Sequence, residues 1–275
     1  MNLKKIACLA LSAITILSLG ACGKKTDTSA EKPLTVVKLG VVGEYNDYWD
    51  VVKEKVKAKG IDLQYVKFSD YSLPNQALAD GEIDMNAFQH YAFLNKQIET
   101  FKYELTPICN TIIAPLGIYS QKNKDLKSFK EGDKIAIPND PTNCGRSLKL
   151  IEAAGLITVD PEKGFIPEIK DVTANPLKLE FVPVEAAQTA SLLPDVAAAI
   201  INGGHAISAK LDPNKDAIYL EQALEGTDNP YINVLVVKTA DKDNENYKTI
   251  AEATTTPEVA KKIEELYKGA FKPAF

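Results

Sequence analysis

Residues 36–68 read Val36-Val-Lys-Leu-Gly-Val-Val-Gly-Glu-Tyr-Asn-Asp-Tyr-Trp-Asp-Val-Val-Lys-Glu-Lys-Val-Lys-Ala-Lys-Gly-Ile-Asp-Leu-Gln-Tyr-Val-Lys-Phe68. The apolar run Val36–Val42 predicts a strand, and Trp49–Lys59 predicts a helix that is stopped by Gly60. Leu63–Phe68 predicts a second strand. A strand, a helix and a strand in this order indicate a parallel pair with a helical crossover.

The same alternation continues along the chain. Pro74–Asp80 predicts a short helix closed by Gly81, Asp84–Phe88 a short strand, and Tyr91–Phe101 a helix. This order favours a largely parallel sheet that is covered on both faces, and such sheets bind ligands at the carboxyl ends of their strands.

A second set of elements begins near Thr111. The strands expected in this part of the chain are Ile112–Tyr119, Lys134–Ile137, Leu179–Pro183, Val196–Ile201 and Ile232–Lys238. The helices expected there are Ser147–Ala154, Ala186–Leu193 and Pro257–Lys268. We therefore predict an α/β fold of two domains, residues 34–110 with 231–275 as domain I and residues 111–230 as domain II. Two crossings between domains make a hinge, and the cleft between them is a natural ligand site.

The N-terminus reads as an export signal. Lys4 and Lys5 precede the apolar run Ile6–Leu19, and Leu19-Gly-Ala-Cys22 matches a lipobox. We expect residues 1–21 to be a lipoprotein signal peptide, Cys22 to carry the lipid, and residues 22–33 to be a flexible tether. The alternative is a transmembrane anchor, for which the apolar run is short.

Charge and cysteine content limit the possible partners. Loss of Lys4 and Lys5 with the signal changes the net charge of −5 to −7, and no basic stripe with interleaved aromatic residues occurs, so we expect no nucleic-acid partner. Cys109 and Cys144 remain after Cys8 is removed and Cys22 is lipidated. The sequence leaves their pairing open and favours two free, mostly buried thiols.

One arginine stands out. Arg146 lies in Pro138-Asn-Asp-Pro-Thr-Asn-Cys-Gly-Arg-Ser147, and the other 31 of the 32 basic residues are lysines. Asp140 or Thr142 can cap the helix that follows, and Pro141 suits its first turn. A guanidinium beside the free N–H groups of a helix start suits a small anion, whereas the alternative is a surface arginine beside an ordinary turn.

Several motifs in a fixed order resemble the MetQ/NlpA family of methionine-binding lipoproteins. They are Asp84-Met-Asn-Ala-Phe-Gln-His90, Pro138-Asn-Asp-Pro-Thr-Asn143, Gly145-Arg-Ser147, Ala187-Gln-Thr189, Val196–Asn202 and Pro230-Tyr-Ile-Asn233. The resemblance runs from the lipobox to the C-terminus. It implies a periplasmic-binding-protein-like fold and the substrate-binding role in an ABC importer.

The resemblance also implies roles for individual residues. Arg146 would clamp the carboxylate of an amino acid, and Asn143 would lie in the same site. The remaining positions form an aromatic wall for the side chain and a polar pair for the zwitterion: Tyr71, Phe88, His90 and Tyr91, then Asn202 and Asn233. The chemistry is consistent, since an amide both donates and accepts, and a thioether favours aromatic neighbours. Taken alone, Phe88 and His90 suit a packed core, the tyrosines a surface, and Asn202 and Asn233 a turn or loop.

Three positions depart from the family pattern. Asn202 is followed by Gly-Gly-His205-Ala, where the family commonly has a larger polar residue and an aromatic residue at the positions of Gly204 and His205. Cys144 stands where the family usually has leucine or a similar residue. If Gly204 and His205 touch the ligand, the pocket is wider or more polar.

The expected function is capture of L-methionine or a close relative by domain closure and delivery to a membrane permease with separate ATPase subunits. We expect a monomer without catalysis, metal or cofactor, anchored on the outer face of a Gram-positive membrane or otherwise on the periplasmic face. The alternatives are a binding protein for another amino acid or a dipeptide, a surface lipoprotein without a transport role, and an exported hydrolase. The hydrolase has little support, because His90 and His205 are the only histidines and no Gly-x-Ser-x-Gly or His-Glu-x-x-His motif occurs.

Overall fold

The computed structural model describes residues 33–44, 46–222 and 229–275. The predicted signal peptide, the lipidation site Cys22 and nearly all of the tether lie outside the described residues.

The first sheet is mixed. Six strands of the described chain form it, in the order β13-β4-β12-β3-β1-β2. Their bounds are β1 (Thr35–Val42), β2 (Ile61–Phe68), β3 (Met85–Asn86), β4 (Leu105–Ile113), β12 (Ile232–Lys238) and β13 (Lys272–Pro273). β1 pairs in parallel with β2 and β3, whereas β12, β4 and β13 pair antiparallel. The predicted parallel pairing is thus confirmed for β1, β2 and β3, and the expectation of a largely parallel sheet is wrong for the other half.

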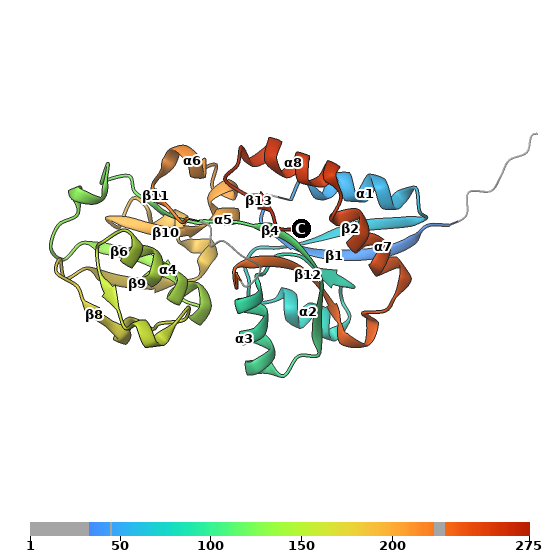
Figure 1. The fold of residues 1–275 in the computed structure, drawn as a ribbon, viewed down its shortest axis with the longest axis horizontal. Coiled ribbons are helices and arrows are strands. Elements are labelled where there is room, and N and C mark those ends of the chain that lie inside the picture. Colours follow the sequence, from blue (N-terminus) through green and yellow to red (C-terminus); the bar gives the residue numbers. More distant parts are fainter. Residues whose placement is uncertain (1–32, 45, 223–228) are drawn as a thin grey trace, which may run out of the picture. The chain divides into compact units, whose positions relative to one another are not determined.

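The second sheet holds the middle of the chain. Five strands of the described residues form it in the order β11-β5-β10-β6-β9. The bounds are β5 (Leu116–Tyr119), β6 (Lys134–Pro138), β9 (Glu180–Val184), β10 (Ala198–Asn202) and β11 (Ala217–Leu220), with a separate pair β7 (Thr158–Val159) and β8 (Val172–Ala174). β6 pairs in parallel with β9 and β10, and β5 pairs antiparallel with β10 and β11. Figure 1 shows β6, β9 and β10 in one group and β1, β2 and β12 in another.

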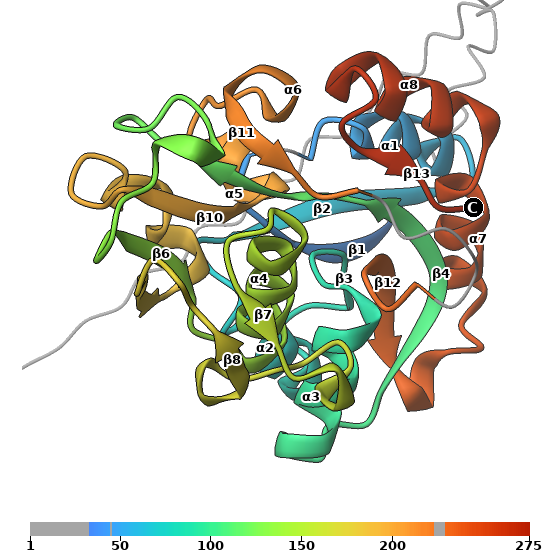
Figure 2. The same cartoon turned by 60° about the vertical axis from the view of Figure 1, so that its left-hand side comes forward.

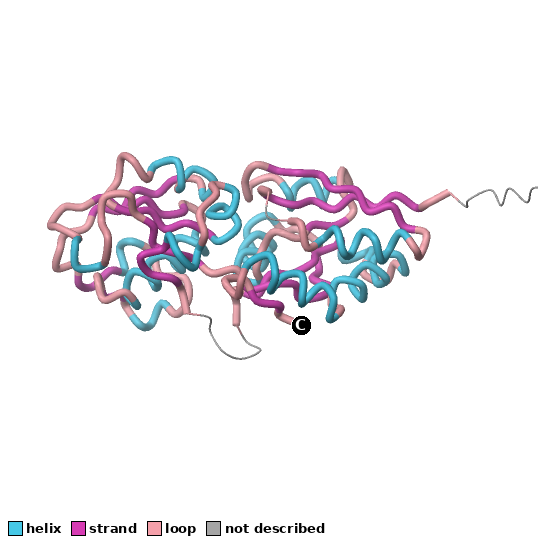
Figure 3. Tube along the Cα trace, turned by 90° about the horizontal axis from the view of Figure 1, so that it is seen from above, coloured by secondary structure: helices cyan, strands magenta, loops and turns pink. Residues whose placement is uncertain are grey.

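Helices cover both faces of the first sheet. The α-helices are α1 (Trp49–Lys57), α2 (Pro74–Asp80), α3 (Tyr91–Phe101), α4 (Pro141–Ala153), α5 (Gly203–Ser208), α6 (Pro213–Asp216), α7 (Glu245–Thr254) and α8 (Pro257–Tyr267). In Figure 1, α1 and α8 lie above the strands of this sheet, and α2 and α3 lie below them. Tyr247 and Ile250 of α7 pack in the same apolar cluster as Trp49 of α1. The alternation of helix and strand along the tube is visible in Figure 3.

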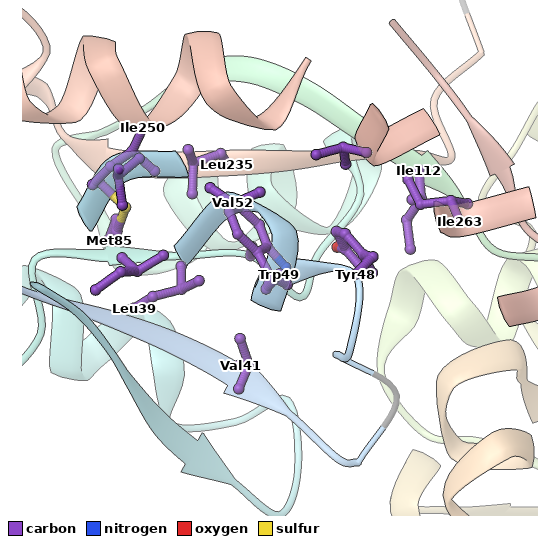
Figure 4. Close-up of a cluster of buried hydrophobic side chains, with 14 of the residues drawn as sticks. Leu39, Val41, Tyr48, Trp49, Val52, Met85, Ile112, Leu235, Ile250 and Ile263 are labelled. Atoms are coloured by element: carbon purple, nitrogen blue, oxygen red, sulfur yellow. The ribbon is translucent and has the colours of Figure 1, made fainter. Parts of the chain in front are cut away.

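The side-chain period of β12 explains this layering. Leu235 and Val237 belong to the apolar cluster that contains Trp49 and Ile250, which Figure 4 shows in close-up. Val234 and Val236 point to the other face and belong to a cluster with α2 and α3. Successive side chains of a strand point to opposite faces, so an uninterrupted apolar strand needs cover on both sides.

Two predicted elements are wrong. The single strand Ile112–Tyr119 is divided, because the chain passes between the sheets at Ala114-Pro115 and proline has no N–H to donate to a ladder. The helix Ala186–Leu193 is replaced by two 3₁₀ turns, Ala186–Gln188 and Ala190–Leu192, closed by i to i+3 bonds such as Gln188 N to Glu185 O at 2.8 Å. Figure 2 shows β4 leading toward the strands of the second sheet.

None of the helices in the described ranges combines the length and the apolar character that a membrane span requires. Cys109 and Cys144 are both free thiols and both partly buried. Burial raises the pKa of Cys109 to about 12 and that of Cys144 to about 11, so both thiols are protonated at neutral pH.

Candidate functional site

A pocket brings together seven of the eight predicted ligand-binding residues. It holds about 380 Å³ of space free of atoms, part of which opens to solvent. Its lining comes from both sheets and from the crossing at Ala114: Tyr71, Phe88, Gln89, His90, Phe93, Ala114, Asn143, Arg146, Asn202, Gly203, Gly204 and Asn233. Arg146 is the one member of this lining that carries a full charge at neutral pH.

The segment Ala87–His90 forms one wall. It follows β3 and ends at His90, the N-cap of α3, whose Nδ1 accepts from the N–H of Phe93 at 3.1 Å. His90 also pairs as an isolated bridge with Asn233, at the start of β12. Because Nδ1 is an acceptor, the proton of the neutral ring lies on Nε2, which donates to Oδ1 of Asn143 at 3.3 Å.

Buried amides support this wall from behind. Asn75 Nδ2 donates to Gln89 Oε1 at 2.8 Å, and Gln89 Nε2 donates to the oxygens of Asn75 and Asn86 at 2.6 and 2.9 Å. All three side chains are almost completely buried. A buried and mutually satisfied amide network fixes its members in one arrangement. It therefore fixes the backbone between Asn86 and His90.

Asn143 connects the two sides of the pocket. Its Oδ1 accepts from His90 and from Nδ2 of Asn202 at 2.8 Å, and its Nδ2 donates to Oδ2 of Asp140 at 2.9 Å. Asn202, the last residue of β10, is 7% exposed, and its Oδ1 has no hydrogen-bond partner among the described residues. An unpaired buried acceptor is costly, so this oxygen suits a donor from a bound molecule.

The structure corrects the expected anion seat at the start of α4. This helix begins at Pro141 and not at Ser147, and Asp140 is its N-cap, with Oδ1 accepting from the N–H of Asn143 at 2.9 Å. The predicted cap and the proline in the first turn are thus confirmed. The carboxylate of Asp140 already occupies the helix start, so the N–H groups there are not free for a second anion.

Arg146 is 2% exposed and fully engaged along one edge. Its Nε and Nη2 donate to the two carboxylate oxygens of Glu221 at 2.8 and 2.5 Å, and Nη2 also donates to the carbonyl of Ala114 at 2.9 Å. Its guanidinium carbon lies 4.2 Å from the ring centroid of Tyr231. Toward the described residues Nη1 makes no hydrogen bond, which leaves its two N–H groups for a ligand.

Aromatic rings form the other end of the pocket. The ring of Tyr71 lies 5.8 Å from that of Phe88 and 6.0 Å from that of Phe93, and these two rings are 5.8 Å apart. His205, which follows the lining residue Gly204 in the chain, packs its ring 4.7 Å from that of Tyr71. These rings make an apolar and polarizable surface.

Tyr91 is the predicted site residue that the structure places elsewhere. Its hydroxyl donates to Oδ1 of Asn110 at 2.8 Å, and its ring packs against the cluster beneath α3. Tyr91 and Phe93 are two residues apart on one helix, so they point in nearly opposite directions. Phe93 lines the pocket instead.

Four contributors were not predicted from the sequence: Gln89, Phe93, Glu221 and Tyr231. Gln89 lies within the motif Asp84–His90, which could have indicated it, and Phe93 follows that motif by three residues, in α3. Glu221 is 75 residues from Arg146, and no local pattern marks it.

Burial keeps the histidines neutral. Burial first, and the charge of Arg146 second, lower the pKa of His90 to about 3. Burial lowers the pKa of His205 to about 4, against the smaller opposing effect of Asp70. At neutral pH the pocket therefore offers one cation, one unpaired amide oxygen and an aromatic wall. In the part of the chain that the structure describes, no cluster of histidine, cysteine and carboxylate side chains could hold a metal.

Comparisons with known proteins agree on one family. The model of the NlpA lipoprotein family matches residues 37–275. A probable D-methionine-binding lipoprotein MetQ of Vibrio cholerae is 38% identical over 270 residues, which cover 98% of this chain and 97% of the relative.

Solved structures agree as well. The crystal structure of protein PG110 from Staphylococcus aureus matches with a TM-score of 0.83 and 44% identity, over 86% of this chain and 94% of that one. A nutrient-binding protein from Burkholderia cenocepacia bound to methionine matches with a TM-score of 0.81 and 36% identity, over 87% of this chain and 100% of that one.

Proposed function

Because this chain belongs to the NlpA lipoprotein family, we propose that it is the lipid-anchored substrate-binding protein of an ABC importer and that it binds methionine. The matches to solved binding proteins confirm the predicted fold class, a mixed α/β fold of the periplasmic-binding-protein type.

The proposal rests on polar groups of the pocket that are complementary to the carboxylate and the ammonium group of an amino acid. Two N–H groups of Arg146 Nη1 are free of partners among the described residues, and Asn202 Oδ1 is a buried acceptor without a donor. An amino-acid carboxylate supplies acceptors for the first, and its ammonium group supplies a donor for the second. Asn233, half-buried on the same lining, offers a second amide to the ammonium group.

The apolar end suits the side chain of methionine. Tyr71, Phe88 and Phe93 present ring edges and faces, and sulfur packs favourably at about 5 Å from aromatic rings. Gly204 lines the pocket without a side chain, and the ring of His205 packs against that of Tyr71. These two departures from the family pattern lie at the side-chain end of the ligand and away from the carboxylate end.

Ligand entry requires the pocket to widen. His90 on one side and Asn143 on the other are in contact across the pocket at 3.3 Å, so an amino acid can enter only when the two sides separate. We propose that the hinge lies at the two crossings between the domains, near Asn110 and near Tyr231. The domains are then residues 34–110 with 231–275, and residues 111–230. Closure would bring Phe88 and His90 of one domain to Arg146 of the other.

The family name supports an extracytoplasmic, lipid-anchored protein. We propose Cys22 as the lipidation site, with the chain on the outer face of a Gram-positive membrane or on the periplasmic face of a Gram-negative cell. The closed form would act as a monomer that docks on a permease with ATPase subunits. We propose no catalysis in this chain, since the pocket groups bind and position without a nucleophile or general base.

Calorimetry on residues 23–275, unfolded and refolded to remove bound ligand, tests the proposal. L-methionine and D-methionine are compared with the other common amino acids and with methionine-containing dipeptides. We expect the wild type to bind methionine tightly. We expect Asn202→Ala to bind it at least tenfold more weakly, because the ammonium group of the ligand loses a hydrogen-bond acceptor worth about 1.5–3 kcal/mol. The matched control is Asn139→Ala, because Asn139 donates to Glu185 at 2.9 Å and does not line the pocket.

The outcomes separate the alternatives. Tighter binding of another amino acid or of a dipeptide would replace methionine as the ligand and keep the importer role. Absence of binding by all of these compounds would contradict the free-amino-acid proposal and favour a surface lipoprotein without a transport role.

A further inference from the structure

We infer that Glu221 determines the charge class of ligand that the pocket accepts, by holding Arg146 in place and cancelling its charge. The inference deepens the proposed function and rests on it. With Glu221 in place the site would select a ligand of zero net charge, a zwitterion, over an anion or a cation of the same shape.

The first step is the geometry of the pair. The carboxylate of Glu221 accepts hydrogen bonds from both Nε and Nη2 of Arg146. The side chain of Glu221 is 16% exposed and that of Arg146 is 2% exposed. A bidentate pair fixes the plane of the guanidinium, and the ring of Tyr231 lies against it at 4.2 Å. The side chain of Arg146 can therefore present only its Nη1 end to the pocket.

The second step is that Glu221 is itself held by the backbone. Its N–H donates to the carbonyl of Leu116 at 2.9 Å, and its Oε2 accepts from the N–H of Leu116 at 2.9 Å. Displacement of the carboxylate by a ligand would leave this N–H and a buried carboxylate unpaired, which is costly. Glu221 is thus a permanent partner of Arg146 and not a temporary occupant that the ligand replaces.

The third step is the charge that the ligand meets. Arg146 is paired with Glu221, and His90 is neutral at neutral pH. Asp140 lies behind Asn143, where the N-terminal dipole of α4 offsets its charge. Asp70, next to Tyr71 at the aromatic end, is partly exposed to solvent. The charges at the polar end of the pocket therefore sum to nearly zero, so an anion would be bound there without net compensation and a cation would lack a partner for its charge.

The test compares Glu221→Gln with the wild type by calorimetry against three compounds. L-methionine is a zwitterion, 4-(methylsulfanyl)butanoate lacks the ammonium group, and L-methioninamide lacks the carboxylate. Glutamine keeps an acceptor for Arg146 but leaves the site with one uncompensated positive charge. We expect the ratio of the dissociation constants of the anion and of methionine to fall about tenfold or more, and the binding of the amide to weaken.

Glu180→Gln is the matched control. Glu180 lies on β9, and its ion pair with Lys134 is exposed at 3.8 Å, so the same change in net charge occurs away from the pocket. The control should leave the three dissociation constants and their ratios unchanged. An unchanged ratio in Glu221→Gln, or an equal change in the control, would overturn the inference.

A second readout follows Arg146 directly and does not depend on the identity of the ligand. The chain has one arginine, so the Nε–H of Arg146 gives a single arginine signal in ¹⁵N-resolved NMR. We expect this signal to be protected from solvent exchange in the wild type, with and without ligand, and to lose protection in Glu221→Gln. Loss of protection on ligand addition to the wild type would show that the ligand displaces Glu221, and this would overturn the inference.

The two proposals fail in different ways. If the wild type binds none of the amino acids, the proposed function fails, while the exchange of the Nε–H still decides whether Glu221 holds Arg146. If methionine binds but the ratio and the protection do not respond to Glu221→Gln, the inference alone fails.

Discussion

At the scale of single residues, the shape of the cation at position 146 matters more than its charge. The planar guanidinium of Arg146 donates hydrogen bonds to Glu221 and to the carbonyl of Ala114, and its Nη1 faces the pocket. In Arg146→Lys one ammonium group would have to serve the same partners from one point. We expect the dissociation constant for methionine to rise about 10- to 100-fold, which corresponds to the loss of about 1.5–3 kcal/mol of a charge-assisted contact. Equal affinity by calorimetry would remove Arg146 from the carboxylate role.

The two histidines predict a pH dependence of stability. Burial lowers the pKa of His90 to about 3 and that of His205 to about 4, whereas an unfolded histidine titrates near 6.5. As pH falls below about 6.5 the unfolded state binds protons that the native state does not bind. The free energy of unfolding then decreases by up to about 1.4 kcal/mol per pH unit for each histidine, until the native pKa is reached.

Urea denaturation between pH 7 and pH 4.5 measures this dependence. We expect His205→Asn to lose less stability than the wild type over that range, because one of the two contributions is removed. Parallel curves for the two proteins would contradict the buried and neutral state of His205. Ligand affinity should stay constant between pH 5 and pH 8, since His90 is neutral throughout.

At the scale of elements, the first turn of α4 joins folding to binding. Asp140 caps this helix through Oδ1 and holds the side chain of Asn143 through Oδ2. Asp140→Ala should therefore cost about 1 kcal/mol of stability and also weaken ligand binding, because Asn143 orients His90 and Asn202.

A cap far from the pocket provides the control. Asn244 caps α7 by accepting from the N–H of Asn246 at 2.9 Å. Asn244→Ala should lower the free energy of unfolding by a similar amount and leave the dissociation constant unchanged. If both variants reduce affinity equally, the effect of Asp140→Ala belongs to general stability and not to the pocket.

Local signals explain which elements could be predicted from the sequence. α2 and α3 have the predicted bounds, because Pro74, Gly81 and the apolar spacing mark their ends within a few residues. β4 was not predicted over Leu105–Thr111, since Pro107 and polar neighbours interrupt its pattern and its place depends on pairing with β12. The pair of Arg146 and Glu221 likewise arises only when the second sheet is assembled. That the pocket residues bind a ligand stays a prediction.

At the scale of the whole molecule, Gly203 lies where several distant segments meet. A Cβ added there would lie 2.8 Å from the ring of Phe271 and 2.9 Å from the carbonyl oxygen of Pro115. Phe271 belongs to the core of the first sheet, Pro115 to the passage between sheets, and Gly203 to the end of the second sheet. Gly203→Ala should therefore lower the free energy of unfolding by about 1–3 kcal/mol.

A double-mutant cycle with Phe271→Leu tests the cause. A smaller side chain at 271 makes room for the new methyl group, so the double variant should lose less stability than the sum of the single variants. Strict additivity would show that Gly203 and Phe271 do not compete for the same space. The rescue should be partial, because the carbonyl of Pro115 cannot withdraw.

The burial of the single arginine also makes the chain nearly immune to one class of protease. An enzyme that cuts only after arginine has one susceptible bond in all 275 residues, Arg146–Ser147. That bond lies inside α4 with both side chains buried, so cleavage requires the helix to unwind from the second sheet. The rate of cleavage at this bond therefore measures how often α4 unfolds locally. A ligand bound to Arg146 would slow this cleavage and so increase the half-life of the intact chain.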